Sequence, residues 1–300
     1  MYQKKFYTLT QSILLATVLS SSLITSACSA ESSNTPILSN QSPPAEIYKL
    51  GLAYYEGYSV PEDDDKAFEL FQKAANQGYV PAKHYLGIMY YEGLGVDQNY
   101  QKAFEWIEQA ANQGYANAQF DLGVIYHEGI AVEQDEIKKL EWFQQAANQG
   151  YTDAQFNLGI MYHESIGIEQ DYQKAMQWYL LAANNGSFDA QNNIGNFYEN
   201  GYGVTQDYDK AFEWYTKAAD QGLDVAQLNI GGLYENGYGV PQDYDIAFEW
   251  YKKAADQGNQ EASNRIGRLV MDDKIDGTGI TIYSTQETGL TLGDIEDMSQ

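Results

Sequence analysis

The sequence repeats itself every 36 residues, and this period limits what the chain can fold into. When the chain is aligned with itself at that spacing, small and aromatic residues return at the same positions without insertion or deletion. The recurring glycines are Gly51, Gly87, Gly123, Gly159, Gly195, Gly231 and Gly267. A fixed period of roughly 20–50 residues is typical of proteins built from stacked structural repeats. We therefore expect one elongated repeat domain.

Each copy predicts two helices. In copy two, Ala82, Leu86 and Met89 fall on one stripe at helical spacing, and Trp106 belongs to the apolar stripe of the second helix. The loop between the helices ends in a residue suited to a helix N-cap, at Asp63, Asn99, Asp135, Asp171, Asp207 and Asp243. One such pair cannot bury its own apolar face, so neighbouring copies must complete the core. The prediction is an all-α, right-handed solenoid of stacked helical hairpins.

The motif LGxxYxxGxGVxQDYxKAxxWYxKAAxQG, almost intact from Ile194 to Gly222, resembles the Sel-one-like repeat, a relative of the tetratricopeptide repeat. The resemblance covers residues 46–261 as six copies and implies adaptor roles in complex assembly and signalling. A cysteine-rich subgroup of these proteins has been linked to β-lactamase activity. The chain has one cysteine, Cys28, so that activity does not carry over. Lys139 replaces a recurrent alanine, and we expect it to reach the surface or to shift the local register.

The net charge of the chain indicates which kinds of partner it can bind. The chain has 42 acidic and 17 basic residues, which gives a net charge of −25. Such a surface repels phosphate backbones and anionic lipid headgroups, so we expect no nucleic acid partner. Solubility is the simplest role of this charge, and the functional alternative is attraction to a basic protein partner. With a single cysteine, neither an internal disulfide nor a cysteine metal site is expected.

The N-terminal segment predicts export. Lys4 and Lys5 precede an apolar run from Ile13 to Ile24, too short to span a bilayer, and residues 1–27 fit a signal peptide. The stretch ITSAC resembles a bacterial lipobox, which would place a lipid on Cys28; ordinary cleavage after Ala27 or Ala30 is the alternative. We expect a periplasmic protein that contacts the outer membrane only through this anchor.

Three further segments follow from composition and period. Residues 28–45 are rich in Ser, Asn and Pro and predict a flexible tether. Residues 46–275 hold the six copies and a C-terminal cap helix, whose arginines and aspartates suit an outer face. Residues 276–300 are rich in Gly, Thr and acids, and we expect an acidic, disordered tail.

One face of the first helix changes character along the repeats. The positions equivalent to 84, 88 and 91 are apolar or aromatic in the first four copies and polar in copy five. Because core positions ought to keep their type along a stack, this variation predicts an exposed concave groove for a segment of another protein. The alternative is that packing between helices buries Leu52, Ile88, Val124 and Ile160. The predicted groove residues are Tyr55, His84, Ile88, Tyr91, Phe120, Val124, His127, Phe156, Ile160, His163, Asn192 and Asn196.

No motif in the sequence predicts catalysis or a cofactor. His127-Glu128 and His163-Glu164 begin like a zinc-binding helix, but the second histidine four residues on is missing. The favoured function is therefore a non-enzymatic, monomeric scaffold that binds a protein partner in the cell envelope. Two alternatives remain open: an envelope hydrolase acting on peptidoglycan or a β-lactam, and a glycan-binding module that uses exposed tyrosines.

Overall fold

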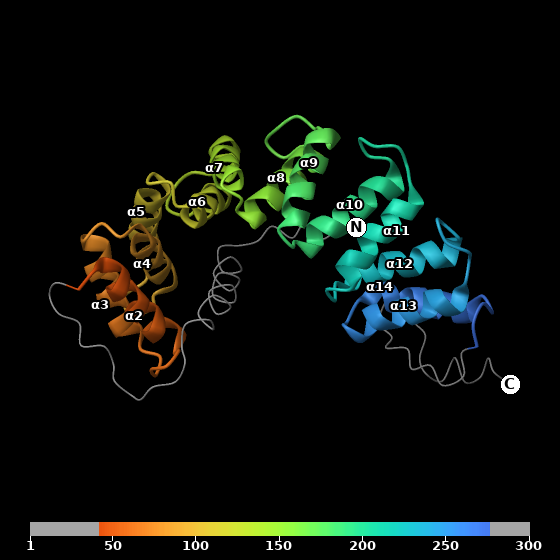
Figure 1. The fold of residues 1–300 in the computed structure, drawn as a ribbon, viewed down its shortest axis with the longest axis horizontal. Coiled ribbons are helices and arrows are strands. Elements are labelled where there is room, and N and C mark those ends of the chain that lie inside the picture. Colours follow the sequence, from red (N-terminus) through yellow and green to blue (C-terminus); the bar gives the residue numbers. More distant parts are fainter. Residues whose placement is uncertain (1–41, 277–300) are drawn as a thin grey trace. The chain divides into compact units, whose positions relative to one another are not determined.

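The computed structural model describes residues 42–276, and within them every regular element is a helix. The all-α solenoid class is confirmed, and the right-handed twist stays a prediction. The signal peptide, Cys28 and most of the tether and tail lie outside the described residues. Figure 1 shows consecutive helices from α2 to α7, and again from α9 to α14, lying side by side. The helices are α2 (Pro44–Glu56), α3 (Asp64–Asn76), α4 (Val80–Glu92), α5 (Tyr100–Ala111), α6 (Ala116–Glu128), α7 (Glu136–Asn148), α8 (Thr152–Glu164), α9 (Tyr172–Asn184), α10 (Phe188–Asn200), α11 (Tyr208–Ala219), α12 (Asp224–Asn236), α13 (Tyr244–Asp256) and α14 (Gln260–Met271).

The chain divides into two compact units, which α8 joins. The first unit runs to Met161 and includes Ser165–Glu169, while the second comprises Tyr162–Glu164 and the residues from Gln170 onward. In the first unit, α2 to α7 pack in chain order, each helix against the next. In the second unit, α9 to α14 do the same, so that α14 covers the last hairpin. Each unit therefore has a core built up hairpin by hairpin, as the period predicts.

The sequence correctly predicts how the helices begin and end. The Asp207 side chain accepts a hydrogen bond from the backbone N–H of Lys210 at 3.0 Å, and the other five predicted N-cap residues do the same in their copies. Gly114, just past the end of α5, has φ = 84°, a backbone conformation that favours glycine. Ser165 takes the left-handed conformation at the end of α8 with φ = 60°, where the equivalent residue in five other copies is glycine.

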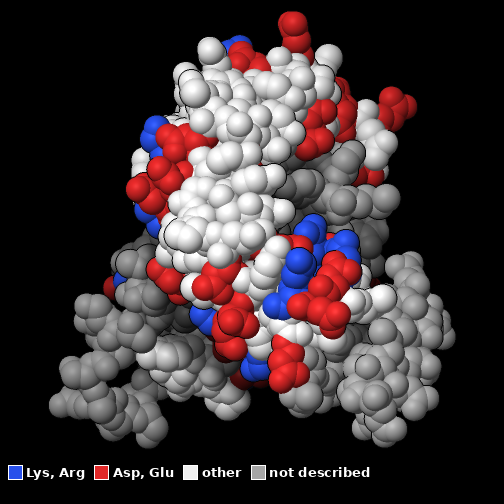
Figure 2. All heavy atoms as spheres, turned by 90° about the vertical axis from the view of Figure 1, so that its right-hand side faces the viewer, with Lys and Arg blue, Asp and Glu red and all other residues white. Residues whose placement is uncertain are grey.

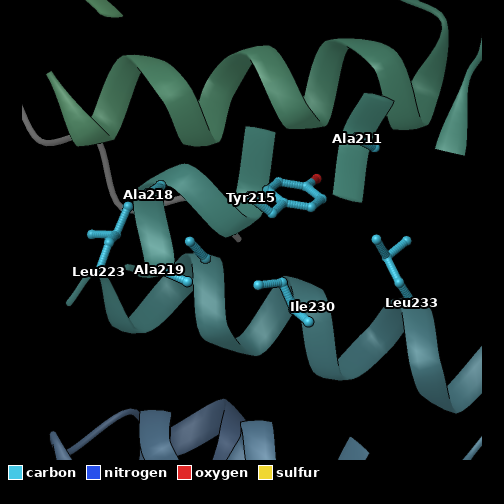
Figure 3. Packing of buried hydrophobic residues seen from close by; sticks show 8 residues of the cluster. Ala211, Tyr215, Ala218, Ala219, Leu223, Ile230 and Leu233 are labelled. Atoms are coloured by element: carbon cyan, nitrogen blue, oxygen red, sulfur yellow. The ribbon is translucent and has the colours of Figure 1, made fainter. Parts of the chain in front are cut away.

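Small residues let the two helices of a hairpin approach closely. A Cβ added to Gly195 of α10 would lie 2.5 Å from the Tyr215 ring of α11, so only glycine fits there. On the other side of α11, Tyr215, Ala218 and Ala219 pack against Ile230 and Leu233 of α12 (Figure 3). The aromatic residue of the second helix thus lies between two successive copies.

In five of the six copies, the loop between the helices of a hairpin is closed by a glutamine. The Gln98 side-chain amide donates to the backbone oxygen of Tyr91 at 2.8 Å. The same bond recurs from Gln134, Gln170, Gln206 and Gln242, at 2.8 to 2.9 Å. A second glutamine set joins the first helix of a copy to the end of the second helix of the same copy: Gln149 donates to Gln119, Gln221 to Gln191, and Gln257 to Gln227. These two sets of bonds fix the loops and hold the two helices of a hairpin together.

Candidate interaction surface

Most of the predicted groove lies inside the helix packing. The buried members, each at most 6% exposed, are His84, Ile88, Phe120, Val124, Phe156, Asn192 and Asn196. They cannot contact a partner, so the prediction is wrong for them. The alternative, that packing buries Ile88 and Val124, is the correct one. These positions vary although they are buried, which requires a physical explanation.

The first explanation is that two of the varying residues, His84 and Asn192, are each matched by a residue 37 positions later, on the next copy. His84 Nε2 lies 2.6 Å from Asp121 Oδ2, with both side chains buried. Asn229 donates its amide to Asn192 Oδ1 at 2.9 Å. Two junctions between copies thus have a polar pair of their own, and there the residue type on one copy depends on its partner on the next.

The second explanation concerns the aromatic position of the second helix. This position is Phe or Ile in the first three copies and Tyr in the last three. The buried Tyr215 hydroxyl lies 2.9 Å from Asn196 Oδ1 and 2.5 Å from Glu199 Oε2, and the Tyr251 hydroxyl donates to Glu235. In copies five and six the first helix therefore becomes polar where it receives a buried hydroxyl group.

The predicted groove residues that stay half-exposed lie mainly at the C-terminal ends of first helices. They are Tyr55, Tyr91, His127, Ile160 and His163. In the first unit, Tyr55, Tyr91 and His127 share these helix ends with the half-exposed Glu92 and Glu128. We call Tyr55, Tyr91, His127, Glu92 and Glu128 the helix-end edge. Three of these five are half-exposed residues of the predicted groove, while the two glutamates were not predicted to belong to it.

The carboxylates of the helix-end edge are poorly solvated. Burial raises the pKa of Glu92, and the nearby charge of Asp64 adds to the shift. Burial also raises the pKa of Glu128, while the nearby His127 lowers it. The Tyr91 ring lies 5.3 Å from the ring of Tyr100, itself 44% exposed. Carboxylates held beside aromatic rings in partly dry surroundings attract a cationic group more strongly than fully solvated ones.

In copy three, Lys139 neither reaches the surface nor shifts the register, so neither expectation for it is correct. Lys139 keeps the helical register of the other copies, and its ammonium group is buried rather than at the surface. It donates to Glu136 Oε2 at 3.1 Å, while His127 Nδ1 lies 2.6 Å from Glu136 Oε1. Burial lowers the pKa of Lys139, and Glu136 acts the other way. Glu136 therefore holds His127 at the end of α6.

In the second unit, His163 lies among aromatic rings. Its ring is 4.9 Å from Phe197 and 5.7 Å from Tyr202, with Tyr172 and Tyr179 also close. Burial lowers its pKa, and Glu164, 3.5 Å away, acts in the opposite direction. The histidine is thus favoured in its neutral form, as part of an aromatic cluster.

The described residues contain no group of three or more His, Cys, Asp or Glu that could hold a metal ion. Among the same residues, no helix is long and apolar enough to cross a membrane. What the geometry offers is therefore a surface of aromatic and acidic side chains on a helical scaffold.

Stacked helical hairpins with such a surface define a class of repeat proteins. The model of the Sel1 repeat matches residues 47–79, 80–115, 116–151, 152–187, 188–223 and 224–259. The chain belongs to the Sel1 repeat family, whose members generally mediate protein–protein interactions. This fold is typically a non-catalytic scaffold.

Two solved structures are similar to the chain over most of its length. One is a protective antigen of uropathogenic Escherichia coli strains that displays an SLR fold, with 36% identity and a TM-score of 0.73. The match covers 78% of this chain but only 50% of the antigen. The other is a Sel1 repeat protein from Oxalobacter formigenes, with 30% identity, a TM-score of 0.70 and coverage of 85% of this chain and 96% of that one. No curated protein matches the chain.

Proposed function

We propose that the chain is a non-enzymatic scaffold of the bacterial cell envelope, and that it binds a protein partner along the helix-end edge. The observation that carries this proposal is that Tyr91 and His127 stay half-exposed, although the three residues that precede each of them on the same helix are buried. Tyr55 is half-exposed at the equivalent position of α2. Aromatic side chains that present both a ring and a polar atom are common anchors of protein interfaces. No feature described above favours the hydrolase or the glycan-binding alternative.

The location in the envelope rests on Cys28 and the preceding apolar run, which lie outside the described residues. A lipid on Cys28 would hold the repeats at the membrane through the tether that follows. Labelling of cells with an alkyne fatty acid should mark the wild-type protein and not Cys28→Ser. If the wild type carries no label, the lipid anchor is ruled out. This result would not bear on the proposed binding at the helix-end edge.

The edge itself is tested by in-cell cross-linking. A photo-reactive residue at Tyr91 should capture a distinct partner, and Tyr91→Ser should abolish retention of that purified partner while helicity and melting temperature stay close to wild type. Tyr58→Ser is the matched control, because Tyr58 is 44% exposed, more than Tyr91, but lies in a loop outside the edge. Equal loss of binding in both variants, or in neither, would rule out the edge.

A further inference from the structure

In each of the first five copies, a lysine of the second helix lies over a tyrosine of the first helix. The Nζ atoms of Lys66, Lys102, Lys138, Lys174 and Lys210 lie 4.7 to 5.2 Å from the ring centres of Tyr54, Tyr90, Tyr126, Tyr162 and Tyr198. In copies one, four and five the same lysine also pairs with the N-cap aspartate, for example Lys210 with Asp207 Oδ2 at 3.0 Å. An ammonium group thus recurs between a ring and a carboxylate.

Copy six keeps the ring and the carboxylate but not the lysine. Tyr234 and Asp243 occupy the two positions, and Ile246 stands where the lysine is in the other copies. The nearby basic side chains of Arg265, Arg268 and Lys274 are engaged with Glu261 and with the Tyr244 ring. Copy six itself therefore supplies no ammonium group to Tyr234.

The local geometry of copy six is otherwise the same as elsewhere. The Tyr234 ring meets Phe212 edge to face at 5.9 Å, as Tyr126 meets Phe104 at 6.1 Å. Asp243 caps α13 by accepting from Ile246 N at 2.9 Å, and its own N–H donates to the oxygen of Tyr234. The ring and the carboxylate are therefore held in the arrangement that receives lysine in other copies.

The position between the Tyr234 ring and the Asp243 carboxylate, which a lysine occupies in other copies, is at the surface and is flanked by apolar groups. The lysine side chains of copies one, four and five are 53 to 56% exposed, so another molecule can reach the equivalent place in copy six. Ile246 is 39% exposed and Tyr238, in the preceding loop, is 42% exposed. Carboxylates border a strip of uncharged side chains on the face shown in Figure 2. The net charge of −25 further favours a cationic occupant.

We infer that Tyr234, Asp243 and Ile246 form a docking surface for a lysine or arginine side chain of a partner protein. The partner's cationic group takes the place between the Tyr234 ring and the Asp243 carboxylate, and its methylene stem lies along Ile246. Cation–π contact and a charge-assisted hydrogen bond then act together on one side chain. This surface lies in the second unit and is separate from the helix-end edge, so either can fail without the other.

Two opposite substitutions test the inference in the full-length protein. Ile246→Lys gives copy six the lysine of the other copies and should fill the place, weakening binding of a fluorescently labelled Lys-rich peptide by about fivefold. Lys210→Ile removes the lysine of copy five and should create a second binding site of the same kind, between Tyr198 and Asp207. The affinity for the peptide should therefore increase. The peptide is titrated by fluorescence anisotropy at physiological ionic strength, and the melting temperature is checked for each variant.

Charge-matched variants keep the outcome clear. Gln101→Lys and Lys49→Ile make the same charge changes at exposed positions of the first unit and should alter affinity much less. Asp243→Asn should weaken binding without loss of the helix cap, because Asn99 caps α5 in the same way. Equal effects of Ile246→Lys and Gln101→Lys, or binding of spermidine as tight as that of the peptide, would overturn the inference.

Discussion

The buried pair of His84 and Asp121 shows how a single residue of this protein depends on the next copy. Among residues 42–276, which the structure describes, His84 Nδ1 has no hydrogen-bond partner, so Asp121 is the group that compensates the imidazole for its lost solvation. A buried pair of this kind contributes little net stability, but removal of one partner leaves the other uncompensated.

His84→Phe should therefore destabilise the protein by about 3–5 kcal/mol, because it leaves a buried carboxylate without its partner. Adding Asp121→Asn should restore most of that loss, since Phe120 and Asn157 are the residues at the equivalent positions one copy later. Urea unfolding of the two single variants and the double variant measures the coupling. Additive effects of the two substitutions would show that the pair does not act as a unit.

His163 connects stability to pH. Burial lowers its pKa below the ordinary value near 6.5, so the unfolded chain binds more protons than the folded chain in the window just below that value. Stability contributed by this group is therefore present above about pH 6.5 and falls as the pH drops through that window. His163→Tyr, which reproduces the residue found at Tyr91, should reduce the fall in melting temperature between neutral and mildly acidic buffer. If the melting temperature of the variant falls by the same amount as that of the wild type, groups other than His163 cause the acid sensitivity.

At the scale of the helices, close approach within a hairpin depends on one glycine per copy. A Cβ on Gly231 would lie 2.5 Å from the Tyr251 ring, whereas a Cβ on the adjacent Gly232 would meet only the Tyr251 hydroxyl oxygen, at 3.8 Å. The two positions share a helix and differ only in the face they present. Substitution of Gly231 therefore tests close packing against α13, whereas substitution of Gly232 tests helix propensity alone.

Gly231→Ala should destabilise the protein by about 1–3 kcal/mol, because α12 and α13 must move apart. Gly232→Ala should be neutral or stabilise it by up to about 1 kcal/mol, since alanine is the better helix former. Chemical denaturation of both variants gives the comparison. Similar effects at the two positions would contradict the close-contact explanation.

The helices were predictable from the sequence because caps, glycines and apolar stripes are local features that recur in every copy. The groove was not, because the prediction compared each position only with its equivalents in other copies. The relevant comparison joins different positions: His84 with Asp121, and Asn196 with Tyr215. A core can change type along a stack when contacting positions change together. The spacing of 37 between His84 and Asp121 was visible in the sequence and could have revealed the pair.

At the scale of the whole molecule, the dominant quantity is the net charge of −25. Like charges repel one another in the compact state, and dissolved salt screens this repulsion over about 10 Å at moderate ionic strength. The melting temperature should therefore rise as sodium chloride is added to a low-salt buffer. Differential scanning fluorimetry checks this, with glycerol as an uncharged control solute. A steady decrease with sodium chloride would mean that attractive ion pairs dominate instead.

The glutamine that closes five of the loops has a consequence for how this protein could diversify. Since Gln98 and its four counterparts bind backbone oxygens of their own hairpins, these loops are all fastened to their first helices in the same way. One residue in these loops differs between copies, as Leu94, Ile130 and Tyr238 illustrate, and it also packs against a helix, as Tyr238 does on Tyr208. A foreign recognition sequence grafted into one loop should therefore keep the glutamine and this packing residue, while the helices beneath keep their arrangement.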